Sequence, residues 1–189
     1  MIDLSNARQP PPLVLNSAVC LLPPASRFAL RGARPVMEAA GAALGTSISD
    51  IACRSAGNGR WAALWLGPDE QLVLAPVADG DEVARRLREA LGALPHSLVD
   101  VSHRQIAVEI CGPPAQTVLN AGCPLDLHIS AFPIGMCTRT LLGKADIVLW
   151  RTGAAAFHVE VWRSFADYAL RFLTEASREL VPNFPETSQ

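Results

Sequence analysis

The sequence has little charge. Of its 189 residues, 18% are Asp, Glu, Lys or Arg, whereas about 25% is usual for soluble domains. The formal net charge is −2, and no segment concentrates Lys and Arg. Binding to nucleic acid is not expected, because it depends on clustered cations that neutralise phosphates. The 50% hydrophobic content predicts a filled core and an apolar surface patch that a partner covers.

Long apolar runs are also missing. Residues 13–22 form the longest run near the N-terminus, but Asn16 and Ser17 interrupt it and no basic segment precedes it. The run therefore does not resemble a secretion signal. No stretch approaches the roughly 18 apolar residues that a spanning helix needs. We expect a cytoplasmic protein with no membrane partner.

Paired cysteines are absent. The five cysteines are odd in number and widely spaced, without a CxxC pair, which argues against a disulfide framework. Reduced, buried thiols are the expected state. A zinc site built from Cys111, Cys123, His128 and Cys137 is disfavoured, because structural zinc usually uses at least one closely spaced ligand pair.

Glycine-rich phosphate loops are absent as well. The sequence contains neither GxGxxG nor GxxxxGK followed by Ser or Thr, so no nucleotide-phosphate site is predicted. The stretch AGNGR at residues 56–60 lies between two candidate strands, and it predicts a hairpin turn.

What the chain does contain is an internal repeat. Shifting residues 61–90 by 85 positions aligns them with residues 146–175, and a shift of 80 aligns residues 28–32 with residues 108–112. The aligned positions share strand alternation and helix signals. We interpret the chain as a duplication.

Each copy predicts the same order of elements, which is a strand, a helix, two strands joined by a turn, and a closing helix. The fold class is therefore α+β, with two pseudo-repeated βαββα units fused in one globular unit. The expected parts are an extended proline-rich arm at residues 1–24, a first repeat at 25–97, a second repeat at 98–180, and a C-terminal tail at 181–189.

The closing helices carry the clearest pattern. Seven apolar residues of the second one recur at helical spacing, namely Phe165, Tyr168, Ala169, Phe172, Leu173, Ala176 and Leu180. Ser164 and, in the first repeat, Asp79 are predicted N-caps. Alternation along the preceding strand places His158, Glu160 and Trp162 on the sheet face away from this helix, where Trp162 could anchor the other repeat or a partner.

Candidate chemistry concentrates in GCPLDLHISAFPIG at residues 122–135. Cys123 could pair with His103 or His128 as an activated nucleophile. The glycine and proline beside Cys123 mark the end of a helix, however, whereas a helix start is what lowers a thiol pKa. We favour a connector in which Asp126 and His128 bond the backbone or meet a partner.

The stretch DVSHR at residues 100–104 precedes a strand. A catalytic interpretation needs a base within hydrogen-bond reach of a nucleophile, but alternation sends Ser102 and His103 to opposite faces. Turn bonding by Asp100 and Ser102 is the preferred interpretation. No catalytic, cofactor-binding or metal-binding residue is predicted for this chain.

Residues 99–150 and 157–176 resemble the gamma subunit family of heterotetrameric sarcosine oxidase. The specific blocks are G-C-x-L-D-L-H…F-P-x-G-x-C-x-x-T at residues 122–140 and R-S-F-A-D-Y at residues 163–168, while F-x-L-R-G at residues 28–32 fits more loosely. This family is in turn similar to the folate-binding T protein of the glycine cleavage system, which accounts for the duplicated plan.

The resemblance implies a heterotetramer that oxidises sarcosine to glycine, with hydrogen peroxide and formaldehyde or 5,10-methylenetetrahydrofolate as further products. The implied partners are the alpha, beta and delta subunits. FAD, FMN, NAD and tetrahydrofolate are implied on those other subunits. This chain would then be a structural and assembly subunit without catalysis of its own.

One alternative stays open, a stand-alone tetrahydrofolate-binding one-carbon transferase or regulator similar to T protein. T proteins carry a carboxylate in the turn that corresponds to RTGAAAF at residues 151–157, and that turn has none here. A pteridine ring needs an acceptor for its N–H donors. Asp100 and Glu160 are the candidate acceptors, and neither lies in that turn.

Overall fold

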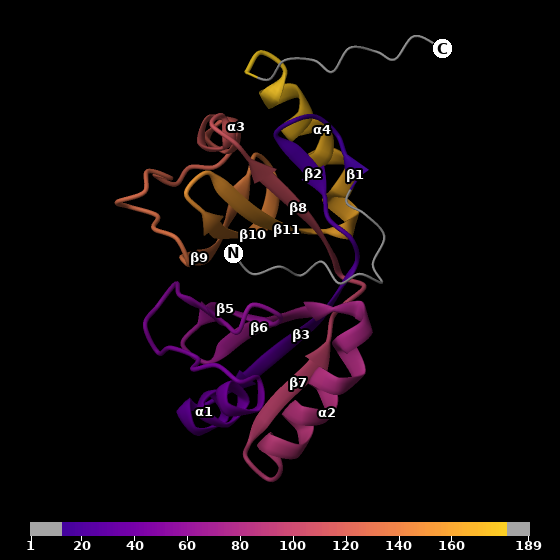
Figure 1. The fold of residues 1–189 in the computed structure, drawn as a ribbon, viewed down its shortest axis with the longest axis vertical. Coiled ribbons are helices and arrows are strands. Elements are labelled where there is room, and N and C mark those ends of the chain that lie inside the picture. The colour runs from indigo at the N-terminus through magenta and orange to yellow at the C-terminus, as the bar shows by residue number, and fades with distance from the viewer. Residues whose placement is uncertain (1–12, 181–189) are drawn as a thin grey trace.

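The structure is a computed structural model that describes residues 13–180. Two antiparallel sheets lie face to face in the middle of the molecule, and helices cover the outer face of each (Figure 1). The order of layers is helices, first sheet, second sheet, helices. No helix among residues 13–180 is long and apolar enough to cross a bilayer.

The first sheet has five strands in the order β4-β5-β6-β3-β7. Their bounds are β3 Ala25–Gly32, β4 Ser55–Gly57, β5 Ala62–Gly67, β6 Glu70–Pro76 and β7 His96–Asp100. The helices on its outer face are α1 Arg34–Ala43 and α2 Gly80–Leu91, and the 3-10 turn η1 Val77–Asp79 precedes α2. The turn at residues 58–61 joins β4 to β5 as an antiparallel hairpin, as predicted.

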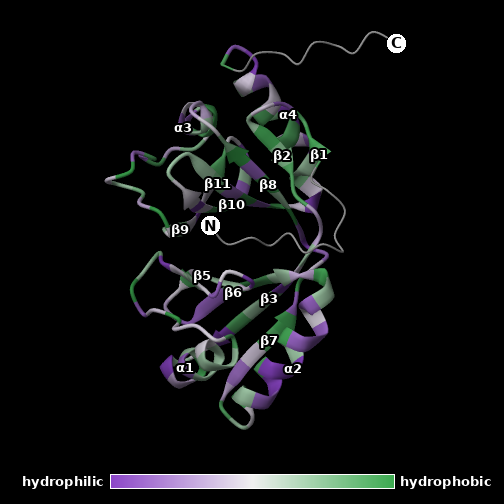
Figure 2. Cartoon of the chain, in the orientation of Figure 1, coloured by the Kyte–Doolittle hydropathy of each residue, from purple (hydrophilic) through white to green (hydrophobic). Residues whose placement is uncertain are grey.

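The core under the first sheet follows from strand and helix periodicity. Phe28 and Leu30 alternate on β3, and Val83 and Leu87 are four residues apart on α2, so that both pairs face the same layer. Pro at the start of α1 suits its first turn. Figure 2 shows hydrophobic residues along the strands and hydrophilic residues on the outer side of α2.

The second sheet has six strands in the order β1-β2-β8-β11-β10-β9. Their bounds are β1 Leu13–Val14, β2 Val19–Leu21, β8 Gln105–Cys111, β9 Cys137–Leu142, β10 Ala145–Gly153 and β11 Ala156–Trp162. Its outer face carries α3 Ala115–Asn120 and α4 Ala166–Ser177, and the 3-10 turn η2 Arg163–Phe165 precedes α4. Leu173 and Ala169 of α4 pack on Val159 and Val161 of β11 in one buried cluster.

Both repeats show the predicted order of elements, with one further strand in each. That strand is β4 in the first repeat and β9 in the second, and each pairs with the strand that follows it. The strand before the AGNGR turn was expected and is β4, although the repeat plan did not include it. The strand β9 was not predicted, because its two buried residues are five positions apart and do not show a strand period.

The edges of the repeats differ from the predicted ranges. Residues 13–21 of the predicted arm form β1 and β2, which belong to the second sheet. The predicted division between residues 97 and 98 falls inside β7, which pairs with β3 of the first sheet. The remainder of the arm, residues 1–12, and the tail, residues 181–189, lie outside the described residues.

The predicted N-cap at Ser164 is wrong, because Ser164 lies in the 3-10 turn before α4. Phe165 takes the N-cap position of α4 instead. Asp79 does occupy the N-cap position of α2, but its side chain makes no cap bond. The Asp79 carboxylate accepts hydrogen bonds from the Arg60 guanidinium at 2.6 and 2.5 Å and from Trp61 Nε1 at 2.9 Å. Both oxygens of the Asp79 carboxylate are therefore used by Arg60 and Trp61, through charge-assisted hydrogen bonds.

Candidate functional site

The space between the two sheets is filled with apolar side chains. Successive strand residues point to opposite faces, so Val159 of β11 points towards α4 and Glu160 points towards the first sheet. The apolar contacts across this space come from β5, β6, β9 and β10, with Ala62, Leu64, Leu72 and Leu74 packed against Cys137, Val148 and Trp150. The two sheet faces therefore pack directly on each other, and the apolar side chains occupy the space that a ligand between the repeats would fill.

Glu160 joins the two repeats at the centre of this space. Its carboxylate accepts hydrogen bonds from Arg27 of β3 at 2.7 and 3.1 Å and from His158 Nε2 at 2.8 Å. Arg27 and Glu160 are both buried, and Arg27 also donates to the Ala25 carbonyl at 2.9 Å. Burial alone raises the pKa of Glu160, but Arg27 and the hydrogen bond from His158 more than offset burial and lower it.

Glu70 makes a second polar connection between the repeats. Its carboxylate binds Arg139 of β9 at 2.5 Å and Arg31 of β3 at 2.6 Å. Arg139 also donates to the Leu66 carbonyl at 3.2 Å. The hydrogen bond from Arg139 is the main cause that lowers the pKa of Glu70, and Arg31 lowers it further against the opposing effect of burial. Each repeat thus contributes one arginine and one carboxylate to the ion pairs that join the repeats.

A groove of about 410 Å³ opens where the end of β5 approaches the second sheet. Its lining comes from both repeats and includes Leu66, Arg104, Gln105, Arg139, Leu141 and Trp162. We call it the Arg104 groove. The Arg104 guanidinium lies 5.0 Å from the centre of the Trp162 ring, within cation–π range. Trp162 does not pack between the repeats, because it remains 45% exposed.

The segment at residues 122–135 is a connector between α3 and β9. Asn120 donates to the Cys123 and Leu125 carbonyls, and Arg151 donates to the Leu127 and Phe132 carbonyls. These bonds satisfy backbone groups of a long loop that has no sheet partner over most of its length. Gln116 donates to the Leu127 carbonyl and Ser55 to the Gly135 carbonyl, so that four side chains from outside the segment hold it in place.

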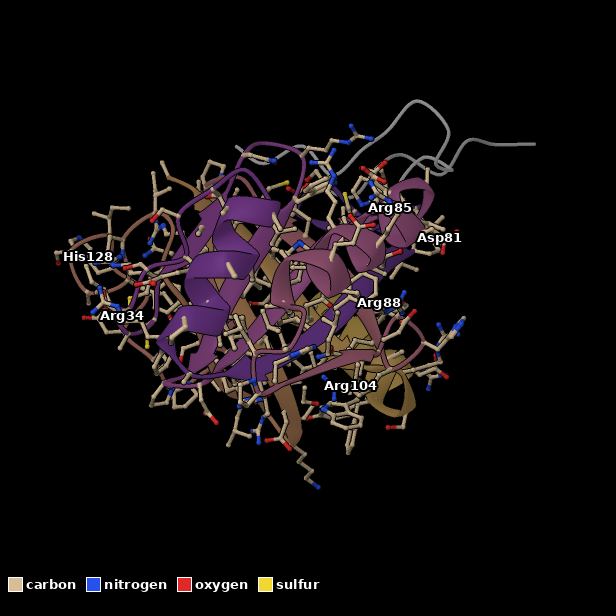
Figure 3. The ribbon with its side chains drawn as sticks, turned by 90° about the horizontal axis from the view of Figure 1, so that it is seen from below. Arg34, Asp81, Arg85, Arg88, Arg104 and His128 are labelled. Atoms are coloured by element: carbon tan, nitrogen blue, oxygen red, sulfur yellow. The ribbon has the colours of Figure 1, made fainter. Side chains whose placement is uncertain are left out.

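The polar residues within that connector bond locally. Asp126 accepts a hydrogen bond from the His128 backbone N–H at 2.9 Å, and His128 Nδ1 lies 2.7 Å from Ser130 Oγ. The Cys123 thiol is buried, with Thr140 Oγ1 at 3.9 Å. The structure does not bring Cys123 into hydrogen-bond contact with His103 or His128 among the described residues. Figure 3 shows His128 and Arg104 on different sides of the molecule.

The four residues considered for a zinc site belong to no metal-binding cluster among the described residues. Within residues 13–180, no three His, Cys, Asp or Glu side chains are arranged to hold a metal ion. Cys137 is buried between the sheets, and burial raises the pKa of its thiol to about 12. A thiol with such a pKa is a poor ligand and a poor nucleophile at neutral pH.

The DVSHR stretch makes the expected turn. Asp100 accepts a hydrogen bond from the Ser102 backbone N–H at 2.9 Å, and Ser102 Oγ accepts one from the Arg27 backbone N–H at 2.9 Å. Hydrogen bonds from Ser102 lower the pKa of Asp100. The turn links β7 to β8, and so passes the chain from the first sheet to the second.

Neither candidate pterin acceptor fits that role. Both Glu160 oxygens are occupied by Arg27 and His158, and the carboxylate is fully buried. Asp100 is engaged in its own turn at the edge of the first sheet. A pteridine ring would have to displace an internal ion pair or a turn to reach either one.

Sequence reasoning missed the arginines that organise these contacts. Arg27, Arg104 and Arg139 come from three different segments. Arg104 ends the DVSHR stretch and Arg139 lies in the family block at residues 122–140, but neither pattern gave the arginine itself a role. A usable signal existed for Arg27. Alternation turns it away from the helix-facing side of the first sheet, where the apolar Phe28 points, just as alternation turns Glu160 away from the helices of the second sheet. A buried carboxylate requires a cation, and Arg27 was available to supply it.

Comparison with known proteins identifies the chain's relatives. The model of the sarcosine oxidase gamma subunit family matches residues 31–179. The chain belongs to this family. Sarcosine oxidase subunit gamma from Corynebacterium sp. strain P-1 is 36% identical over 148 residues, which cover 78% of this chain and 70% of that protein. The corresponding Arthrobacter subunit is 37% identical over 154 residues, covering 78% and 75%.

Solved structures agree with this membership. The structure of this chain matches a chain of the heterotetrameric sarcosine oxidase from Corynebacterium sp. U-96 with a TM-score of 0.81 and 29% identity. The match covers 92% of this chain and 90% of that one. Aminomethyltransferase T of the Bartonella henselae glycine cleavage system matches with a TM-score of 0.61 and 14% identity, covering 82% and 44%. The second likeness shows a shared fold alone, and it confirms the predicted T-protein-like class.

Proposed function

We propose that this chain is the gamma subunit of a heterotetrameric sarcosine oxidase and that its role is structural. Its partners are the alpha, beta and delta subunits, and the complex oxidatively demethylates sarcosine to glycine in the cytoplasm. FAD, FMN, NAD and tetrahydrofolate are held by the other subunits. Membership of the gamma subunit family carries the proposal.

The internal chemistry of the chain supports a structural role. Among residues 13–180 the buried carboxylates are Glu160, Glu70 and Asp79, and each is bound by at least one arginine. Carboxylates neutralised in this way serve the fold and are not free to act as general bases. The chain therefore contributes surface and shape to a complex whose cofactors lie on other subunits.

The exposed apolar side chains fit the same role. Trp162, Leu141 and Phe165 each expose more than 40% of their surface. Trp162 and Leu141 line the same groove, and exposed apolar residues that gather in one place are typical of an association surface.

Co-expression of this chain with the alpha, beta and delta subunits of one bacterial sarcosine oxidase tests the proposal. An affinity tag on this chain should retain all four subunits, and the eluate should show flavin absorption and sarcosine-dependent hydrogen peroxide production. Purified alone, the chain should be colourless and should not bind tetrahydrofolate in a fluorescence titration.

The matched control omits only this chain from the co-expression. A structural role predicts lower yield of the assembled complex, while the alpha and beta subunits that do assemble keep their cofactors. The proposal fails if the tagged chain retains none of the other subunits. It also fails if the isolated chain binds tetrahydrofolate with micromolar or better affinity.

A further inference from the structure

We propose that the Arg104 groove is where this chain binds an acidic side chain on an extended segment of another oxidase subunit. The inference rests on the proposed function, because it presumes that such a subunit exists. It adds the surface and the chemistry of the contact, which membership of the family does not supply.

Arg104 provides the charge. Its guanidinium stacks on Trp162, and no ion pair joins it to a carboxylate among residues 13–180. Its Nε is buried and has no hydrogen-bond partner there. An unpaired buried donor is unfavourable, and a carboxylate is the acceptor that a guanidinium fork matches best.

The neighbouring charges leave Arg104 as the cation that is available to a partner. Arg139, the other arginine of the groove, is already bound by Glu70 through both of its terminal nitrogens. Asp146 also lines the groove, but no ion pair links it to Arg104. A carboxylate that enters the groove would therefore meet one unneutralised guanidinium, already oriented by the ring beneath it.

The rest of the groove fits a peptide segment. Gln105 is 4% exposed, and its Oε1 is a buried acceptor that has no partner among residues 13–180, so that it can accept a backbone N–H. Trp162 and Leu141 supply exposed apolar surface. Arginine and tryptophan are the residue types that most often dominate binding energy at protein interfaces. The volume of about 410 Å³ admits a few side chains, so this contact anchors a larger interface.

A competition experiment with full-length chains tests the groove. Wild-type and variant chains with different tags are co-expressed with the alpha, beta and delta subunits, and mass spectrometry measures the ratio in which they enter the complex. The test variants are Arg104→Glu and Trp162→Ala. Arg171→Glu is the matched control, because it makes the same charge change at an exposed residue of α4, in the outer helix layer.

We expect Arg104→Glu to be outcompeted by wild type at least roughly tenfold, and Trp162→Ala by a similar factor, as for interface hot spots. Arg171→Glu should enter within about twofold of wild type, since it lies outside the groove. Arg104→Gln should fall between wild type and Arg104→Glu, because it removes the charge without reversing it. Melting curves of the isolated variants check that each is folded.

Two failures are distinguishable. If wild-type chain does not enter the complex, the proposed function itself fails. If wild type enters and the folded Arg104 and Trp162 variants enter equally well, the subunit role stands and the groove is not the docking site. Equal losses in Arg104→Glu and Arg171→Glu would also overturn the proposal, because the effect would then follow net charge and not this surface.

Discussion

The two repeats complete their sheets with strands taken from opposite directions along the chain. In the first repeat, β3 pairs with β7, which follows α2, and Leu30 lies opposite Leu98. In the second, the equivalent strand β8 pairs with β2, which precedes the first repeat, and Ile110 lies opposite Val19. Each repeat therefore has a strand beside its first strand, β3 or β8, but that strand comes from a later segment in one repeat and from an earlier segment in the other. An unpaired edge at β3 or β8 would expose its backbone groups.

The closing helices α2 and α4 are held to their repeats by different polar contacts. In the first repeat, Asp79 at the start of α2 binds Arg60 and Trp61 with its charge. In the second, the Tyr168 hydroxyl of α4 accepts a hydrogen bond from the Lys144 backbone N–H at 3.1 Å. The same backbone arrangement thus tolerates a charged contact in one copy and an aromatic, neutral one in the other.

The largest expected effect comes from breaking the connection between the repeats. Arg27→Met should lower the free energy of unfolding by about 3–5 kcal/mol, because it leaves the Glu160 charge buried without its arginine. Urea denaturation measures this loss.

Two matched variants sharpen that measurement. Arg34→Met removes exposed ion pairs with Glu38 and Asp50 and should leave the free energy of unfolding nearly unchanged, because exposed pairs contribute little. The double variant Arg27→Met with Glu160→Leu should recover much of the loss, since it removes the uncompensated charge. An Arg27→Met chain as stable as wild type would show that Glu160 finds another cation.

Next in size is the contrast between the two helix fastenings. Asp79→Asn should lower the free energy of unfolding by about 1.5–3 kcal/mol, because it weakens hydrogen bonds to a charged group. Tyr168→Phe should cost only about 0.5–1.5 kcal/mol, because it loses one neutral hydrogen bond. Urea denaturation of both variants checks the order, and the reverse order would contradict the comparison.

The edge strand of the second sheet is expected to matter locally. Val19 is fully buried, and Val19→Ala removes two methyl groups, at about 0.8 kcal/mol each. Amide hydrogen exchange should therefore accelerate by roughly tenfold in β8 and β11. The amides of β3 and β6 serve as an internal control. Equal acceleration in both sheets would show that the repeats open together and not separately.

The smallest expected effect is on the pH dependence of the free energy of unfolding. Arg60 is the main cause that lowers the pKa of Asp79 from its ordinary 3.8. The unfolded chain therefore takes up this proton first as the pH falls, and stability present above about pH 4 is lost below it. Asp79→Asn lacks this site, so it should lose less stability than wild type between about pH 7 and pH 3. Denaturation at both pH values measures the difference, and parallel losses would rule out a contribution from Asp79.

Much of the fold could be predicted from the sequence. The alternation of Phe157 with Val159 and the spacing of Leu173 on α4 are local patterns, and they fix where strands and helices form. The DVSHR turn could be predicted for the same reason, because Asp100 bonds a backbone group two residues away. The failed N-cap at Ser164 shows the limit of such rules, since one 3-10 turn moved the helix start.

The candidate site could not be predicted in the same way. The Arg104 groove combines Leu66, Arg104, Leu141 and Trp162, which no local pattern connects. The family blocks at residues 122–140 and 163–168 indicated relatives, but only the end of the first block, at Arg139 and Thr140 of β9, lines the groove. The family blocks are continuous stretches of sequence, whereas the Arg104 groove forms where segments that are far apart in the sequence meet.

By itself, the sequence determined the repeat, the order of its elements and the faces on which apolar residues fall, because these depend on contacts within a few residues and on the periods of strand and helix. Only the tertiary structure decided that β2 joins the second sheet, that Arg27 pairs with Glu160, and that Arg104 has no carboxylate partner within residues 13–180. Those outcomes depend on which strands become neighbours. That choice is made by burial summed over both sheets, and no single segment encodes it.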